Sequence, residues 1–200
     1  MKKNLPQKSN RNLSGFEQRL TIGSELLNQE ESNNDEVYFH FMCGKNALFE
    51  NRVYAAIEYF NKVITYFENI SADKRFIMKL GRKVPYDEYV NSLLLRGNAN
   101  YSLQNENLAI KDYSKCIVAD NSNIGAYRNR AICYMNTNLI DYAIKDFSVI
   151  VKLKEYCPEI HRYLGYCYEK IKDKNNSKLH FSIAADQGDK ESIKKLIDDK

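Results

Sequence analysis

The chain has 200 residues, of which 44% are hydrophobic and 28% are charged, which suits one ordinary domain or one short solenoid with a continuous core. Its 30 Lys and Arg against 26 Asp and Glu give a formal net charge of +4, a mild excess that argues against nucleic acid as the partner. We expect neither a transmembrane helix nor a signal peptide, because no long apolar run occurs, even after the basic start at Met1, Lys2 and Lys3. The five cysteines are irregularly spaced and odd in number, which is typical of reduced thiols in a cytoplasmic protein.

The first 36 residues precede the repeated part of the sequence. Residues 1–12 are polar and without periodicity, which predicts a disordered N-terminus. Ser14 and Glu17 form a capping-box pair, and an apolar stripe follows along residues 15–29, which together predict a helix. Residues 13–36 are therefore assigned to an N-terminal helix and a polar linker.

One spacing pattern then recurs four times. A small residue is followed 12 positions later by a second small residue, 4 positions later by an aromatic residue, and 3 positions later by a small or medium one. The four copies are Gly44, Ala56, Phe60 and Val63; Gly97, Ala109, Tyr113 and Cys116; Ala131, Ala143, Phe147 and Ile150; and Gly165, Ser177, Phe181 and Ala184. Two small residues allow antiparallel helices to approach closely, and the aromatic ring one turn further on fills the space between them.

Copies two, three and four follow each other at steps of 34 residues, whereas copies one and two are separated by one repeat plus a 19-residue insertion. The pattern resembles the tetratricopeptide repeat (TPR), with Leu164-Gly165 and Tyr168 in the fourth copy and Ala143 and Phe147 in the third. It departs from the family pattern where Ala47 and Asn100 replace the Tyr, and no copy contains the Trp. The resemblance covers residues 37–187 and implies an all-α, TPR-type right-handed helical solenoid of four helix-turn-helix repeats.

The predicted segments after residue 36 are repeat one at 37–70, a basic insertion at 71–89, repeat two at 90–123, repeat three at 124–157, repeat four at 158–188, and a C-terminal capping helix at 189–200. Gly188 is expected to end the last repeat helix. Ile193, Leu196 and Ile197 of the capping helix are expected to face inward, because a terminal repeat needs a cap with a polar outer face.

The sequence contains no pattern typical of a catalytic or metal site. His40, His161 and His180 share no spacing and are treated as separate residues of different repeats. Cys157 and His161 form a single Cys-x3-His pair, which falls short of the paired ligands of a zinc site. The single Gly-Lys pair, Gly44-Lys45, lacks the flanking phosphate-loop pattern. We therefore expect no enzyme activity, no cofactor and no metal.

The resemblance implies that the first helix of each repeat lines a concave groove that takes a peptide or helix of a partner protein. The candidate groove residues are Lys45, Asn98, Tyr101, Arg128, Ile132, Arg162, Tyr166 and Glu169. Aromatic, Asn and Arg side chains are common in binding surfaces. Arg128 and Arg162, both expected to be exposed, suit paired hydrogen bonds to carboxylates. The alternative is that these side chains are solvated or covered by the N-terminal helix of the chain itself.

Some TPR domains resemble chaperone adaptors, which clamp the C-terminal carboxylate of heat-shock chaperones with Lys, two Asn, Lys and Arg. On repeats two to four, those places hold Leu94, Asn98, Asn129, Glu159 and Tyr163. On repeats one to three, they hold Phe41, Lys45, Leu95, Gly125 and Asn129. Because the cationic set is missing in both registers, we predict no such clamp.

These features predict a cytoplasmic, non-catalytic scaffold or adaptor that binds a segment of another protein, without indicating its oligomeric state. One alternative is a dedicated bacterial chaperone or immunity-type protein for one secreted or toxic partner. Another is an anion or nucleic-acid binder that uses residues 74–83 of the insertion, which include Lys79, Arg82 and Lys83 and carry five positive charges and no negative one. We favour a solvated helix extension for the insertion, because charge runs are usually solvated.

Overall fold

The computed structural model describes residues 33–70 and 86–198, and every regular element in these ranges is a helix. The helices are residues 33–49, α2 (Val53–Asn69), α4 (Tyr86–Ser102), α5 (Glu106–Ala119), α6 (Ile124–Asn136), α7 (Ile140–Leu153), α8 (Pro158–Lys170), α9 (Lys174–Asp186) and α10 (Lys190–Asp198). Residues 1–36 and 37–200 are separate units, and the repeats lie in the second. The predicted disordered N-terminus, the predicted helix at 15–29, and Lys79, Arg82 and Lys83 lie outside the described residues.

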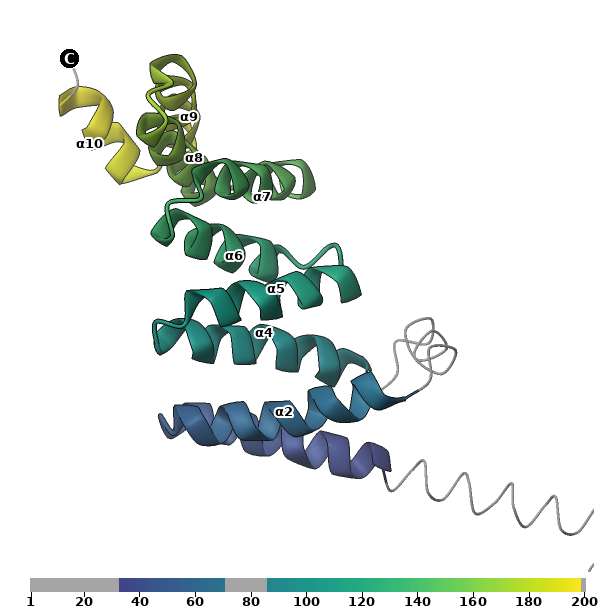
Figure 1. Cartoon of the computed structure of the whole chain (residues 1–200). Coiled ribbons are helices and arrows are strands. Elements are labelled where there is room, and N and C mark those ends of the chain that lie inside the picture. The colour runs from purple at the N-terminus through teal and green to yellow at the C-terminus, as the bar shows by residue number, and fades with distance from the viewer. Residues whose placement is uncertain (1–32, 71–85, 199–200) are drawn as a thin grey trace, which may run out of the picture. The chain divides into compact units, whose positions relative to one another are not determined.

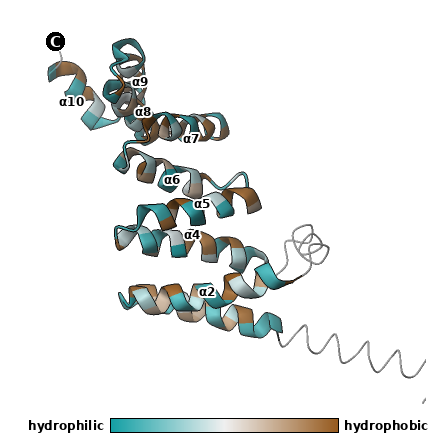
Figure 2. Ribbon diagram, viewed as in Figure 1, coloured by the Kyte–Doolittle hydropathy of each residue, from teal (hydrophilic) through white to brown (hydrophobic). Residues whose placement is uncertain are grey.

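Helices that follow one another in the chain pack against each other within residues 37–200 (Figure 1). The pairs α4–α5, α6–α7 and α8–α9 form repeats two, three and four, and the next helix in the chain packs on each pair. Brown and teal residues alternate along the ribbons, as expected for helices with one apolar face (Figure 2). The structure thus confirms the predicted all-α, TPR-type solenoid. Within the described ranges, no helix is both long and apolar enough to cross a membrane.

The repeat spacing has a steric cause. A Cβ atom built on Gly97 would lie 2.6 Å from Cε1 of Tyr113, and one on Gly44 would lie 2.5 Å from Cε1 of Phe60. Both rings are fully buried. The first small residue therefore leaves room for the aromatic ring of the second helix, as the pattern predicts. In repeat three, Ala131 occupies the equivalent position.

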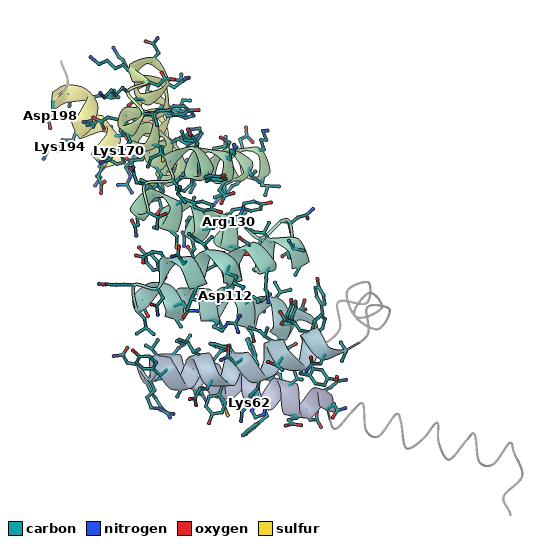
Figure 3. The ribbon with its side chains drawn as sticks, in the orientation of Figure 1. Lys62, Asp112, Arg130, Lys170, Lys194 and Asp198 are labelled. Atoms are coloured by element: carbon teal, nitrogen blue, oxygen red, sulfur yellow. The ribbon has the colours of Figure 1, made fainter. Side chains whose placement is uncertain are left out.

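Buried ion pairs connect the helices of repeats two and three. Arg96 on α4 donates two hydrogen bonds to the carboxylate of Asp112 on α5, at 2.9 and 2.5 Å, and a third to Asn61 on α2, at 2.5 Å. Arg130 and Asp146, 34 residues after Arg96 and Asp112, form the same pair in repeat three, and Ser114 takes the place of Asn61; Asp112 and Arg130 are labelled in Figure 3. Each arginine thus joins the two helices of its own repeat to the second helix of the repeat before it.

Two helix boundaries differ from the predicted segments. Residues 33–36, assigned to the linker, are helical, and their Asp35 and Glu36 carry charges that suit the start of a helix. The helix α4 begins at Tyr86, so residues 86–89, assigned to the insertion, are also helical. Tyr86 is buried, and its hydroxyl donates to the carbonyl of Ala119 at 2.8 Å. Core contacts of this ring extend the helix beyond the repeat pattern.

The C-terminal helix α10 packs on α9 through a different face from the one predicted. Ser192 is fully buried, whereas 42% of Ile193 and 63% of Ile197 are exposed, and Leu196 is only partly buried. The expectation that the three apolar residues face inward is therefore wrong. The small Ser192 allows α10 to approach α9 closely, and its hydroxyl donates to Asp189, which caps the helix. This orientation turns the isoleucines away from the core.

Candidate partner-binding face

The eight candidate groove residues all lie on first helices of the repeats, and we refer to them together as the groove face. Lys45 lies on the helix of residues 33–49, Asn98 and Tyr101 on α4, Arg128 and Ile132 on α6, and Arg162, Tyr166 and Glu169 on α8. Contacts between consecutive first helices decide whether these residues share one surface.

Side chains of α4 and α6 meet directly on the groove face. The Oδ1 atom of Asn98 accepts hydrogen bonds from Nδ2 of Asn129 at 2.8 Å and from the hydroxyl of Tyr113 at 2.9 Å. About one turn further along α4 and two turns further along α6, Nδ2 of Asn136 donates to the hydroxyl of Tyr101 at 3.3 Å. The two helices therefore run side by side here. Asn98 is occupied by internal bonds, whereas Tyr101 stays partly exposed.

The face continues from α6 to α8. The guanidinium group of Arg128 lies 3.8 Å from the carboxylate of Glu159, and both side chains are nearly half exposed. An exposed pair at this distance contributes only about 0–1 kcal/mol. Because the pair is weak, a carboxylate of a partner can replace Glu159 beside Arg128.

Arg162 was also expected to be exposed, but it is largely buried. Its side chain is only 16% exposed and forms ion pairs with Glu191 of α10 and with Asp189, the residue that caps α10. Further along α8, Glu169 accepts a hydrogen bond from Lys195 of α10 at 2.9 Å. The prediction that Arg162 is exposed is therefore wrong, because α10 packs beside α8 and supplies the opposite charges.

The remaining residues of the groove face have local contacts. Lys45 is exposed, and its ammonium group lies 5.5 Å from the ring centroid of Phe41, one turn earlier in the same helix. Tyr166 packs edge-on against the buried ring of Phe181, with centroids 5.0 Å apart, and Ile132 is partly buried. Lys45 is therefore available to a partner, whereas Tyr166 serves mainly in packing.

The sequence and the fold were compared with known proteins. No protein-family model matches the sequence. The human DnaJ homolog subfamily C member 7 is 22% identical over 174 residues, which are 72% of this chain and 35% of that protein. Its mouse counterpart is 23% identical over 165 residues, 67% of this chain and 33% of that protein. The chain therefore spans about a third of the length of the curated relatives it matches.

Among solved structures, a tetratricopeptide repeat protein from Parabacteroides merdae superposes with a TM-score of 0.64 at 13% identity, over 78% of this chain and 55% of that chain. The chain has the TPR fold. The first TPR of Spaghetti (RPAP3), bound to the HSP90 peptide SRMEEVD, superposes with a TM-score of 0.51 at 20% identity, over 55% of this chain and 88% of that chain. At these identities, the likeness concerns the fold.

The residues at the positions that clamp a chaperone C-terminus in some TPR domains contact each other or their neighbours in this chain. Asn98 and Asn129, which match the clamp pattern on repeats two to four, are bonded to each other. Glu159 stands where the clamp has a lysine, and its carboxylate pairs with Arg128. An acidic C-terminus placed here would meet a negative charge and two amides that are already hydrogen-bonded.

The cysteines of the described residues are free thiols, four of them buried. Burial raises the pKa of Cys116 and Cys167 to about 12 and that of Cys133 to about 11. Because the thiolate is the nucleophile, these protonated thiols serve in packing. Within the described ranges, no three His, Cys, Asp or Glu side chains gather as a metal site would need.

Two histidines form a pair that the sequence interpretation missed. His161 and His180 both belong to repeat four, and their Nδ1 atoms lie 2.9 Å apart, so treating them as residues of different repeats was wrong. One Nδ1 atom must donate and the other must accept. Burial lowers the pKa of both imidazoles, and the neighbouring His161 lowers that of His180 further. The 34-residue register could have found the pair, because it aligns His180 with the buried Asp146.

Proposed function

We propose that this chain is a non-catalytic scaffold or adaptor whose groove face binds a peptide or helix segment of another protein. The main support is the series of side-chain contacts that joins consecutive first helices, from Tyr101 and Asn136 to Arg128 and Glu159. Such a row of aligned, partly exposed side chains is the surface that stacked repeats offer to an extended partner. The first TPR of Spaghetti, which has the same fold, is bound to a peptide.

The exposed members of the groove face indicate the chemistry of the partner segment. Arg128 is 45% exposed and only weakly held by Glu159, so it favours a carboxylate with two parallel hydrogen bonds. Tyr101 is 38% exposed and adds an aromatic ring to the groove face on α4. Lys45 adds a positive charge on the helix of residues 33–49. The partner segment should therefore combine acidic and apolar side chains.

Arg128 and Tyr101 provide a direct test. The double substitution Arg128→Glu with Tyr101→Ala should keep the fold, since both side chains are exposed, and should reduce capture of the partner about tenfold or more. The partner is first identified by affinity purification with the wild-type chain and then purified for calorimetry. Lys111→Glu on α5 is the matched control, because it reverses a charge on an exposed second-helix residue. Equal affinity of the double variant and the wild type would exclude the groove face.

The same fold also binds chaperone C-termini, so the peptide SRMEEVD is an informative probe. We expect no measurable binding of this peptide by calorimetry, because the cations that would clamp its C-terminal carboxylate are missing. The first TPR of Spaghetti is the positive control. Binding of the peptide by our chain would contradict the predicted absence of a chaperone clamp, though not the groove face itself.

The number of captured proteins separates an adaptor from the alternative, a dedicated chaperone or immunity-type protein. An adaptor captures several proteins that share a short segment. A dedicated chaperone recovers one protein in a fixed ratio. Mass spectrometry of the eluted proteins, repeated with the double variant, distinguishes the two.

A further inference from the structure

A trough of about 830 Å3 lies between α9 and α10, at the C-terminal end of the solenoid and apart from the exposed cations of the groove face. Its apolar surface includes Phe181 of α9 and Ile193, Leu196 and Ile197 of α10. The two isoleucines are 42% and 63% exposed. Contiguous exposed apolar side chains of this kind mark interaction sites.

The apolar residues of α10 lie on a different side of the helix from its buried contact with α9. In α10, the small polar Ser192 is buried against the repeats, while the isoleucines point away from the core. The polar and apolar residues of α10 are thus arranged for a further contact on its exposed side.

The rim of the trough is positively charged. Lys172, Lys174 and Lys178 line it, whereas the single acidic lining residue, Glu169, is already engaged by Lys195. Lys170 of α8 and Lys194 of α10 add positive charge at the same end of the solenoid (Figure 3). An occupant must therefore combine apolar side chains with negative charge.

These charges distinguish between occupants. A second copy of the chain, docked through the same patch on both protomers, would bring Lys172, Lys174 and Lys178 of both copies into one interface, and this repulsion opposes such a dimer. An anionic membrane has the required charge. However, it favours a protruding apolar face, whereas a trough between two helices accepts inserted side chains.

We propose that the α9–α10 trough is a second docking site, which takes an amphipathic helix of a partner protein with an apolar stripe bordered by acidic residues. The stripe packs on Ile193, Leu196 and Ile197, and the acidic residues face Lys174 and Lys178. An added helix would contact α9 and α10 in the way that neighbouring helices of the solenoid contact each other. This site goes beyond the groove face, with which it shares Glu169, and it does not depend on Arg128 or Tyr101.

Two synthetic helical peptides with the same leucine stripe test the proposal by fluorescence anisotropy with the full chain. One peptide carries Glu beside the stripe and the other carries Lys. The acidic peptide should bind about tenfold tighter or more, and Lys174→Glu with Lys178→Glu should reverse that preference. Ile197→Asp should weaken both peptides, and it should fold because this side chain is mostly exposed. Lys111→Glu with Lys152→Glu, on exposed residues of α5 and α7, should change neither affinity.

Several results would overturn the second docking site. These are failure of both peptides to bind, equal binding of the two peptides, or an unchanged preference in the Lys174→Glu and Lys178→Glu variant. Binding to vesicles of anionic lipid but not to the acidic peptide would assign the trough to membranes. Self-association abolished by Ile197→Asp would assign it to a second copy. The groove-face variant Arg128→Glu with Tyr101→Ala should bind the acidic peptide normally, so the two sites can fail independently.

Discussion

Repeats two and three are joined by buried ion pairs, whereas repeat four contains a histidine pair in the same register. Arg96 and Arg130 each bind an aspartate on the second helix of their own repeat. One 34-residue step further, Leu164 and His180 replace the arginine and the aspartate, and His180 bonds to His161 instead. One helix pair can therefore be joined by two different chemistries, an arginine–aspartate ion pair or a hydrogen-bonded pair of histidines.

The two regions also differ in how neighbouring repeats are connected. Arg130 reaches back to Ser114 of repeat two, at 2.9 Å. The equivalent serine of repeat three, Ser148, donates to Ile144 of its own helix. The junction of repeats three and four depends instead on packing, such as the stacked rings of Phe147 and Tyr163, with centroids 5.3 Å apart. The buried arginine connection between repeats thus ends where the histidine pair begins, and the polar pair at this junction, Arg128 with Glu159, is exposed.

The largest effect should come from removing one partner of a buried ion pair. Asp146→Ala leaves the largely buried Arg130 without its carboxylate, and it should lower the free energy of unfolding by about 3 kcal/mol. The double variant Arg130→Leu with Asp146→Leu removes both charges, and its leucine at 130 matches Leu164, the equivalent residue of repeat four. This variant should lose less unfolding free energy than Asp146→Ala. Urea unfolding measures both variants. A double variant as unstable as Asp146→Ala would show that lost packing, rather than the unpaired charge, causes the effect.

A somewhat smaller effect should come from filling the space at a repeat glycine. Gly97→Ala places a methyl group against the ring of Tyr113, and the resulting overpacking should cost about 1–3 kcal/mol in thermal unfolding. Gly125→Ala is the matched control, because the nearest atom to its new Cβ would be 3.4 Å away. Tyr113→Leu in the Gly97→Ala background should recover part of the loss. If both glycine variants behave alike, close approach at Gly97 does not explain the repeat spacing.

The histidine pair should make the stability of repeat four depend on pH. Burial lowers the pKa of His161 and His180 in the folded chain below the ordinary value of 6.5. The unfolded chain therefore binds more protons below about pH 6.5, and the contribution to stability, complete above that pH, is lost as the pH falls. Thermal unfolding measured at several pH values between about 7.5 and 5 should show this decrease, because histidine side chains change their charge within about pH 5–8.

The variant His161→Leu with His180→Leu is the control for this pH dependence. It should be less sensitive to pH over the same range, because neither ring remains to be charged. A decrease in stability as large as that of the wild type would assign the acid sensitivity to groups outside repeat four.

The features that the sequence predicted are those set by the repeat register. The contact of Gly97 with Tyr113 follows from a spacing of 16 residues, which places a glycine of one helix against a ring of the next. The exposure of Arg162 was misjudged because its partner, Glu191, lies in α10 and outside the repeats. Ile193 and Ile197 were misjudged for a related reason. The face that α10 turns to α9 depends on Ser192 and Asp189, to which hydrophobic periodicity gives no weight.

The smallest effects separate the two arginines of the groove face. Arg162→Ala removes ion pairs of a largely buried side chain and should cost about 1–2 kcal/mol, mainly by releasing α10. Arg128→Ala, with its exposed pair, should cost less than about 1 kcal/mol. Hydrogen exchange should therefore be faster in α10 for the first variant and unchanged there for the second. Equal exchange in the two variants would mean that α10 is held by its contact with α9 alone, and Arg162 would then be available to a partner on the groove face.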